Sequence, residues 1–232
     1  MKKIGIIGAM DVEIAALKEH MTVTGTLEKA SMLFTEGTIG EVGVVVVKSG
    51  VGKVNAGICV QILADTFGVT HVINTGAAGS LDAKLDIGDI LISSDAVSWD
   101  VDATIFGYAP GEVPQLGVES FPADAAMAAK VKEICERVNP DIHTHIGRVA
   151  SGDCFIADDE RKTFIRDTFG ASCCEMEGAA VAHACWLNGL PFLIIRAISD
   201  KADGSEFLDY LLFEAKAGED AARLLLAALP EL

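Results

Sequence analysis

Long apolar runs are missing from this sequence of 232 residues, and so are runs of basic residues. No apolar stretch approaches the roughly 18 residues that a membrane-spanning helix needs. The apolar segment at residues 4–7 is soon followed by Asp11 and Glu13, which makes it too short for the core of a signal peptide. We therefore expect neither a membrane partner nor secretion.

Basic side chains are scarce relative to acidic ones. The 18 lysines and arginines stand against 34 aspartates and glutamates, which gives a formal net charge of −16. A surface this acidic repels the phosphates of a nucleic acid unless it contains a basic groove. No cluster of Lys and Arg along the sequence could form such a groove, so we expect no nucleic-acid partner.

The six cysteines include no Cys-x-x-Cys pair and no spacing typical of zinc ligands. Their scattered positions in apolar segments indicate buried free thiols in a reducing compartment, which predicts a cytoplasmic protein. His143 and His145 alternate along a predicted strand, but two imidazoles without a third ligand are weak evidence for a metal site. We predict neither a metal nor an organic cofactor.

The sequence does contain the periodicity of an α/β protein, in which short apolar runs alternate with helical segments. Strands are predicted over residues 3–8, 32–39, 41–48, 71–75, 90–98, 143–151, 172–175 and 191–199. Helices are predicted near residues 12–16 and over residues 53–67, 123–138, 158–167, 178–188 and 208–229. Residues 100–122 are rich in Pro and Gly and predict a long loop, which in a compact domain is usually functional. With no linker or repeat, residues 1–232 are predicted to form one domain.

Small or acidic residues follow many of the predicted strands at the point where each strand ends. These endings are Gly8-Ala-Met10, Ser49-Gly50, Thr75-Gly-Ala-Ala-Gly79, Ser151-Gly-Asp153, Glu175-Met-Glu177 and Ser199-Asp200. Ligands of open α/β sheets bind at the carboxyl ends of strands, so six such endings predict a site assembled from many loops. The glycine spacing fits neither a dinucleotide-binding fingerprint nor a P-loop.

Several charged residues at these positions could carry chemistry. Asp200 follows the last apolar strand, where partial loss of water favours the protonated carboxyl that a general acid needs. Arg196 lies inside the same apolar run and needs a carboxylate partner or a ligand. An extended Glu175–Glu177 segment would point both carboxylates to one side of the sheet. For Glu13, which opens the first helix, stabilisation by the helix dipole is a sufficient explanation by itself.

The motifs occur in an order that matches a known family. They are Gly8-Ala-Met10-x-x-Glu13, Ser49-Gly-Val-Gly-Lys-Val54, Asn74-Thr-Gly-Ala-Ala-Gly79, Phe106-Gly-Tyr108, Ser151-Gly-Asp-Cys-Phe-Ile156, Glu175-Met-Glu177 and Arg196-Ala-Ile-Ser-Asp200. From residue 4 to about residue 215, the chain resembles bacterial 5′-methylthioadenosine/S-adenosylhomocysteine nucleosidases of the nucleoside phosphorylase/nucleosidase superfamily. The resemblance implies a homodimer and a single-domain three-layer α/β/α sandwich with a central mixed, partly barrel-like sheet.

The resemblance also implies an activity. Such enzymes hydrolyse the N-glycosidic bond of 5′-methylthioadenosine, S-adenosylhomocysteine and 5′-deoxyadenosine, releasing adenine in methionine salvage and S-adenosylmethionine recycling. By the family pattern, Asp200 protonates adenine N7 and Ser199 holds that carboxyl in place. Glu13 deprotonates the attacking water, while Glu177 accepts hydrogen bonds from the ribose hydroxyls and favours the developing cation.

The remaining site residues follow from the same resemblance. Phe155 would stack on adenine, and the backbone of Ile156 would bind its Watson–Crick edge. The sugar would contact Met10 and Met176, with Arg196 near Glu177. An apolar channel for the 5′ group would be lined by Val51 and Phe207 and by Ala103, Phe106 and Pro114 of the partner subunit. Ala77 and Ala103 depart from the family, where serine and a larger aliphatic residue are common at these positions.

Two related activities remain as alternatives: a purine or uridine phosphorylase of the same fold, and a nucleosidase for another adenosine derivative such as aminodeoxyfutalosine. A phosphorylase needs a phosphate site, whereas the first strand-end loop here carries Met10, Asp11 and Glu13. Carboxylates at that position repel phosphate and favour water, so we predict hydrolysis. A nucleoside-binding module without catalysis is disfavoured because Glu13, Glu177 and Asp200 are all present.

Overall fold

A computed structural model describes the backbone of residues 2–202 and 207–232, and the side chains of residues 2–202, 216 and 218–232. Ten strands form one sheet in the order β10-β6-β8-β9-β5-β1-β4-β3-β2, and β7 pairs with β6. The strands are β1 (Lys3–Gly8), β2 (Thr22–Lys29), β3 (Met32–Ile39), β4 (Val42–Lys48), β5 (His71–Ser80), β6 (Ile90–Ser98), β7 (Phe121–Pro122), β8 (Thr144–Ser151), β9 (Cys173–Glu175) and β10 (Phe192–Asp200).

Part of the sheet closes on itself. Strand β10 pairs with β5 as well as with β6, so β5, β10, β6, β8 and β9 form a closed ring of five strands. Within this ring the β5–β10, β6–β8 and β8–β9 pairs are parallel, whereas β6–β10 and β5–β9 are antiparallel. The predicted mixed and partly barrel-like sheet is confirmed.

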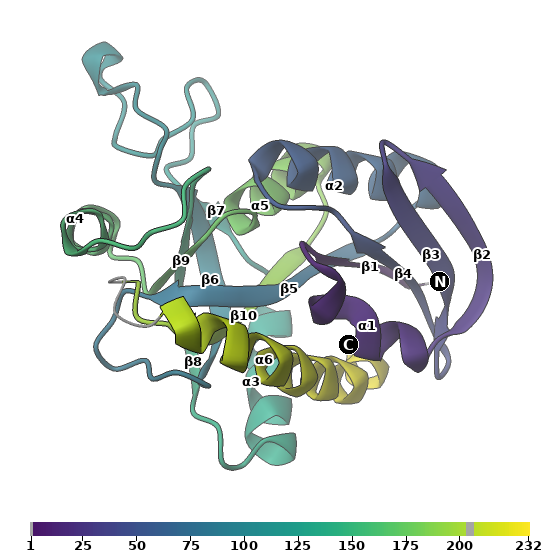
Figure 1. Cartoon of the computed structure of the whole chain (residues 1–232). Helices are drawn as coiled ribbons and strands as arrows, with labels where there is room; N and C mark the ends of the chain where they lie inside the picture. Colours follow the sequence, from purple (N-terminus) through teal and green to yellow (C-terminus); the bar gives the residue numbers. More distant parts are fainter. Residues whose placement is uncertain (1, 203–206) are drawn as a thin grey trace.

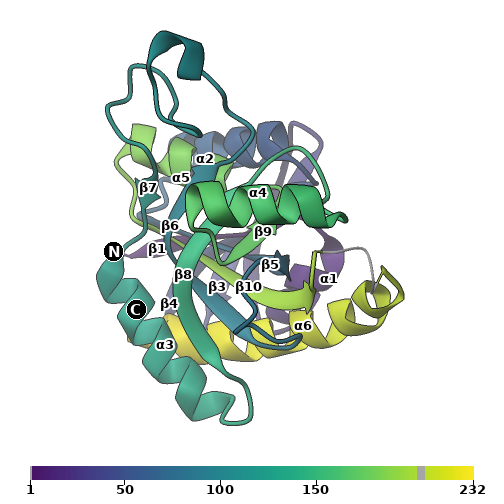
Figure 2. The same cartoon turned by 90° about the vertical axis from the view of Figure 1, so that its left-hand side faces the viewer.

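Helices cover the sheet from two sides (Figure 1). Helices α2 (Lys53–Phe67) and α5 (Gly178–Asn188) pack together on one side, and α1 (Asp11–Glu19), α3 (Ala125–Val138) and α6 (Phe207–Ala228) pack on the other. Helix α4 (Asp159–Phe169) lies beside β8 and β9 (Figure 2). This arrangement confirms the predicted three layers.

The central strand β4 shows how the sequence builds both helical layers. Val44, Val45, Val46 and Val47 are all fully buried. Because successive side chains of a strand point to opposite faces, Val45 and Val47 join the core under α2 and α5, while Val44 and Val46 join the core under α1, α3 and α6. A run that is apolar on both faces therefore fixes the strand between two layers.

Two strand predictions are wrong. Strand β2 was not predicted because its eight residues are exposed or half-buried throughout, and such an edge strand lacks the alternation of apolar and polar residues that marks a half-buried strand. Strand β5 continues to Ser80 instead of ending at Thr75, because Gly76 and Gly79 lie inside the strand. The predicted loop over residues 100–122 ends in the short strand β7, and helix α1 continues to Glu19, three residues beyond its predicted end. The other predicted elements are present with boundaries shifted by at most two residues.

The predicted long loop connects β6 to β7 and projects from the body of the molecule (Figures 1 and 2). It contains one short 3-10 helix, Thr104–Phe106, in which Ile105 is 89% and Phe106 is 80% exposed. Among the described residues, no helix combines the length and the apolar character needed to cross a membrane.

Candidate functional site

A pocket of about 590 Å³, partly open to solvent, lies where several strands end. Its lining comes from the segments after β1, β4 and β8, from the ends of β5, β9 and β10, and from the first turn of α1. The lining residues are Ala9, Met10, Glu13, Val51, Ala77, Ala78, Gly79, Cys154, Phe155, Ile156, Cys174, Glu175, Met176, Glu177, Ser199 and Asp200. The structure thus brings together ten of the predicted site residues in one pocket.

Glu13 lies in the first turn of α1, with its carboxylate turned back onto backbone amides. Its Oε2 accepts hydrogen bonds from the amides of Ala9 at 2.6 Å and Met10 at 3.0 Å, and its Oε1 accepts one from Ala77 at 3.2 Å. Burial raises the pKa of Glu13, against the opposing effects of the Arg196 charge and of these amides. The amides that an anion could bind at this strand end are occupied by a carboxylate of the protein itself.

Strand β5 passes directly beneath this carboxylate. A Cβ atom at Gly76 would lie 2.6 Å from Oε1 of Glu13 and 3.2 Å from Nη1 of Arg196. Any larger residue would displace one of these two charged groups. The glycine that the sequence presents as a strand terminator therefore lies within the strand and makes room for the site.

Asp200 occupies a similar position three residues further along β5. A Cβ atom at Gly79 would lie 2.8 Å from its Oδ1. The carboxyl group is 8% exposed, and it accepts hydrogen bonds from the Ser199 hydroxyl at 2.9 Å and from the Ala202 amide at 2.8 Å. The two carboxyl groups thus contact β5 at glycines three residues apart, and both line the same pocket.

Glu177 begins helix α5 and also contacts helix α2. Its Oε1 accepts a hydrogen bond from the amide of Gly52 at 2.8 Å, at the N-terminus of α2. Burial, together with the negative charge of Glu175, raises the pKa of Glu177 to about 7, against the opposing charge of Arg196.

The predicted parallel arrangement of Glu175 and Glu177 is wrong, because β9 ends at Glu175 and the chain turns into α5. The Glu175 carboxylate accepts hydrogen bonds from the amides of Glu177 at 3.1 Å and Gly178 at 2.8 Å, and one from the hydroxyl of Ser151. It also forms an ion pair with Arg196. Glu175 is therefore held by protein donors, whereas Glu177 reaches toward α2.

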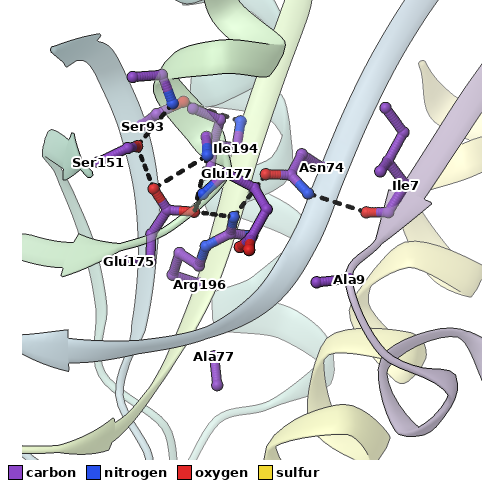
Figure 3. A network of polar contacts seen from close by, with 12 residues as sticks. Ile7, Ala9, Asn74, Ala77, Ser93, Ser151, Glu175, Glu177, Ile194 and Arg196 are labelled. Atoms are coloured by element: carbon purple, nitrogen blue, oxygen red, sulfur yellow. Dashed lines mark hydrogen bonds and ion pairs between the residues drawn. The ribbon is translucent and has the colours of Figure 1, made fainter. Parts of the chain in front are cut away.

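Arg196 does not line the pocket and is 1% exposed. Figure 3 shows it among its polar contacts with Asn74 and Glu175. Burial lowers its pKa, but the charges of Glu175, Glu177 and Glu13 outweigh that effect and the net shift is upward. The carboxylate partner that the sequence required for Arg196 is Glu175.

The open side of the pocket is more apolar. Phe155 is 49% and Val51 is 50% exposed, whereas Ile156 is buried. Cys154 is partly exposed and lines the pocket, so the prediction that every cysteine is a buried core residue is wrong for this one. All six cysteines are free thiols.

Of the other predicted site residues, Arg196, Ala103, Phe106 and Pro114 do not line this pocket. Ala103, Phe106 and Pro114 belong to the projecting loop, where Ala103 is buried and the other two are exposed. The backbone of Phe207 begins α6, but its side chain lies outside the described residues.

Sequence reasoning missed the residues that support Arg196 from below, above all Asn74. Its amide lies 2.5 Å from Nη2 of Arg196 and donates to the carbonyl of Ile7 at 3.0 Å. The available signal was a polar amide inside the otherwise apolar segment 72–75. His143 and His145 lie 3.5 and 3.4 Å from Asp89, and within the described part of the chain no three His, Cys, Asp or Glu side chains could hold a metal ion.

Comparisons with known proteins agree with this geometry. The family model "Phosphorylase superfamily" matches residues 3–230. A 5′-methylthioadenosine/S-adenosylhomocysteine nucleosidase of Exiguobacterium sp. is 38% identical over 99% of this chain and 98% of its own length. This chain belongs to that nucleosidase family. The resemblance found in the sequence motifs is thereby confirmed.

Solved structures support the same family. The nucleosidase of Colwellia psychrerythraea in complex with adenine has a TM-score of 0.95 and 38% identity, covering 100% of this chain and 96% of that one. The futalosine hydrolase of Helicobacter pylori has a TM-score of 0.93 and 33% identity, covering 100% and 98%. The methylthioadenosine/S-adenosylhomocysteine nucleosidase fold therefore also includes a relative with a different named substrate.

Proposed function

We propose that this chain is an N-glycosyl hydrolase that cleaves 5′-methylthioadenosine and S-adenosylhomocysteine, and also 5′-deoxyadenosine, to adenine and the corresponding sugar. The position of Glu13 is the observation that favours water over phosphate as the nucleophile. Its carboxylate occupies the backbone amides of Ala9, Met10 and Ala77. A phosphate ion at that place would have to displace a carboxylate and then lie beside it.

Bond cleavage needs a good leaving group and an activated water. Asp200 protonates adenine N7, so that adenine leaves as a neutral base, and Ser199 and the Ala202 amide fix the carboxyl for this transfer. Glu13 takes a proton from the water that attacks the anomeric carbon. Two carboxyl groups on opposite sides of a scissile glycosidic bond are the general solution for such chemistry.

The sugar develops positive charge as the bond breaks. Glu177 accepts hydrogen bonds from the ribose hydroxyls, and its ionised form stabilises that charge. Arg196 compensates the carboxylates from beneath while remaining shielded from the ligand by its burial. The other substrate contacts are assigned to Met10 and Met176 at the sugar, Phe155 and Ile156 at adenine, Ala77 near the sugar or purine, and Val51 and Phe207 at the 5′ group.

The 5′ end of the pocket is completed by a second copy of the chain in this proposal. Ala103, Phe106 and Pro114 belong to a loop that projects from the body (Figure 1). The exposure of Ile105 and Phe106 on its tip is costly in water and is explained by burial against a partner. We therefore infer a homodimer in which each loop lines the pocket of the other subunit.

The free thiols bear on the cellular compartment, and the continuous sheet bears on the number of domains. Six free cysteines persist in a reducing compartment, which supports a cytoplasmic location. Residues 1–232 act as one nucleosidase domain, since one continuous sheet supplies the strand ends around the pocket.

The similarity to a futalosine hydrolase supports one alternative substrate, namely another adenosine derivative such as aminodeoxyfutalosine. The test is competition between 5′-methylthioadenosine, S-adenosylhomocysteine and aminodeoxyfutalosine at equal concentrations, with released adenine and the remaining substrates measured by mass. We expect the two thio-substituted nucleosides to have the larger kcat/KM. A larger kcat/KM for aminodeoxyfutalosine would assign the alternative.

A further inference from the structure

A chain of buried polar groups runs beneath the pocket and joins five strands of the sheet (Figure 3). It passes from the carbonyl of Ile7 in β1 to Asn74 in β5, Arg196 in β10, Glu175 in β9 and Ser151 in β8. All four side chains in it are at most 9% exposed, so their contacts are set by the protein and not by solvent.

The orientation of the Asn74 side-chain amide is fixed by the donor or acceptor character of its two hydrogen-bond partners. A guanidinium can only donate hydrogen bonds and a backbone carbonyl can only accept them. The Asn74 Oδ1 therefore faces Nη2 of Arg196 at 2.5 Å, and its Nδ2 donates to Ile7 at 3.0 Å. Because β1 leads directly into the turn that carries Glu13, Asn74 ties Arg196 to the strand that presents Glu13.

Glu175 holds Arg196 from the other side. Although it lines the pocket, its oxygens accept from the Ser151 hydroxyl and from the amides of Glu177 and Gly178 in addition to pairing with Arg196. These donors use its acceptor capacity within the protein. Glu175 therefore ties Arg196 to the start of α5, which presents Glu177.

We propose that Asn74 and Glu175 are positioning residues for glycosidic cleavage, which hold the Arg196 guanidinium between Glu13 and Glu177 so that one buried cation compensates both carboxylates. The inference rests on the proposed function for its kinetic readout. Its geometric basis is that Arg196 Nη1 and Glu13 Oε1 both lie against Gly76, while Nη2 contacts Asn74 and Glu175.

The charged and titratable groups that face Arg196 come from three elements: Glu13 of α1, Glu177 at the start of α5, and Glu175 and Cys173 of β9. Burial raises the pKa of Cys173 well above its usual range, so this thiol stays neutral. The Arg196 charge lowers the pKa of both Glu13 and Glu177, whereas the Glu175 charge raises that of Glu177. Movement of Arg196 would thus change the pH at which the two carboxylates ionise.

The test uses Asn74→Leu, which keeps the branched heavy-atom skeleton of the side chain and removes both hydrogen bonds of the amide. Thr75→Val is the matched control, since Thr75 is equally buried on the same strand and its hydroxyl has no hydrogen-bond partner. We expect the acid limb of the kcat/KM profile for 5′-methylthioadenosine to move to higher pH by about one unit in Asn74→Leu, with activity recovering toward high pH. Thr75→Val should keep the wild-type profile.

Glu175→Gln both loosens Arg196 and removes the charge that opposes ionisation of Glu177. Because these two effects on the pKa of Glu177 oppose each other, we expect a smaller shift of the same limb than in Asn74→Leu, together with a lower kcat/KM. A uniform loss of activity at every pH in both variants, or the same shift in Thr75→Val, would overturn the proposal and leave a purely structural role. Asn74→Ser is measured in parallel, because its smaller polar side chain keeps the test available if the leucine variant does not fold.

A second readout separates this inference from the proposed function. Thermal unfolding of each variant between pH 5 and pH 9 reports the ionisation of buried carboxylates without any substrate. With Arg196 displaced in Asn74→Leu, stability should fall more steeply with rising pH than in the wild type. An unchanged slope contradicts the positioning role, whereas absence of nucleoside cleavage by the wild type contradicts only the proposed function.

Discussion

The carboxylate of Glu13 lies directly over the backbone of Gly76, so that a single added methyl group would approach Oε1 to 2.6 Å. At Gly76, strand β5 packs against two groups, the carboxylate of the proposed base Glu13 and the guanidinium of Arg196. The site is therefore built around a glycine that has no room for a side chain, although its backbone is ordinary extended strand.

Replacement of Gly76 tests this contact. Gly76→Ala should displace Glu13 or Arg196 and lower kcat on the order of 100-fold, because small misplacement of catalytic groups is costly. Gly25→Ala is the control, since nothing lies within 4 Å of a Cβ at that strand residue. Steady-state kinetics and thermal unfolding of both variants separate the effects. Wild-type kcat in Gly76→Ala would contradict the packing described here.

Removal of the proposed base or acid should abolish most turnover while leaving the fold intact. Glu13→Gln and Asp200→Asn each keep the shape of the side chain but remove its proton chemistry, so kcat should fall about 10²- to 10⁴-fold. Substrate affinity, measured by calorimetry with the inactive variants, should change far less. Substantial turnover by either variant would exclude its assigned role.

Activity should fall at acid pH because Glu13 and Glu177 must both be ionised. Burial raises the pKa of each, to about 7 for Glu177, so kcat/KM should decline below about pH 7. With two groups taking up protons, log kcat/KM should fall with a slope approaching two. In Glu177→Gln the slope should approach one, on a much lower plateau. An unchanged slope in that variant would show that Glu177 does not titrate.

The same raised pKa predicts a stability effect with a definite sign. Between the ordinary glutamate value of 4.5 and about 7, the folded protein binds more protons at Glu177 than the unfolded chain does. Stability therefore falls as pH rises through this window. At pH 8 the free energy of unfolding of Glu177→Gln should exceed that of the wild type by a few kcal/mol at most, since one pKa unit is about 1.4 kcal/mol. The variant should therefore have the higher melting temperature. Equal melting temperatures would refute this.

The inferred dimer is tested through the projecting loop. Ile105→Asp should produce a monomer in light scattering, because a charge at an 89% exposed apolar tip opposes its burial by a partner. Leu33→Asp on strand β3, where the side chain is 50% exposed, should leave the assembly unchanged. Phe106→Ala should raise KM for 5′-methylthioadenosine more than it lowers kcat. A wild-type chain that is monomeric at micromolar concentration would contradict the inferred dimer.

The sequence predicted most of the fold where periodicity was strong. The valine run of β4 and the apolar run of β10 predicted strands, and both runs are buried strands in the structure. Strand β2 could not be found, because an exposed edge strand has no buried face to mark it. The end of β5 was misplaced because glycine is ambiguous: it terminates strands, but it also permits close approach of other groups.

The pocket was predictable in outline, since Gly, Ser and acidic residues at strand ends pointed to one edge of the sheet. What the sequence could not separate was the pair Glu175 and Glu177, which are two positions apart and have different hydrogen-bond partners. Only the turn at the start of α5 shows that the first is held by protein donors and the second faces the ligand space. Asn74 was equally hidden, because a lone buried amide has no spacing pattern.

The most direct test of the account is the reaction with 5′-methylthioadenosine in ¹⁸O-labelled water containing millimolar phosphate, followed by mass spectrometry of the sugar product. If Glu13 occupies the anion position and activates water, the methylthioribose will carry one ¹⁸O atom and no sugar phosphate will form. Formation of a methylthioribose 1-phosphate, with adenine release dependent on phosphate, would contradict the central claim.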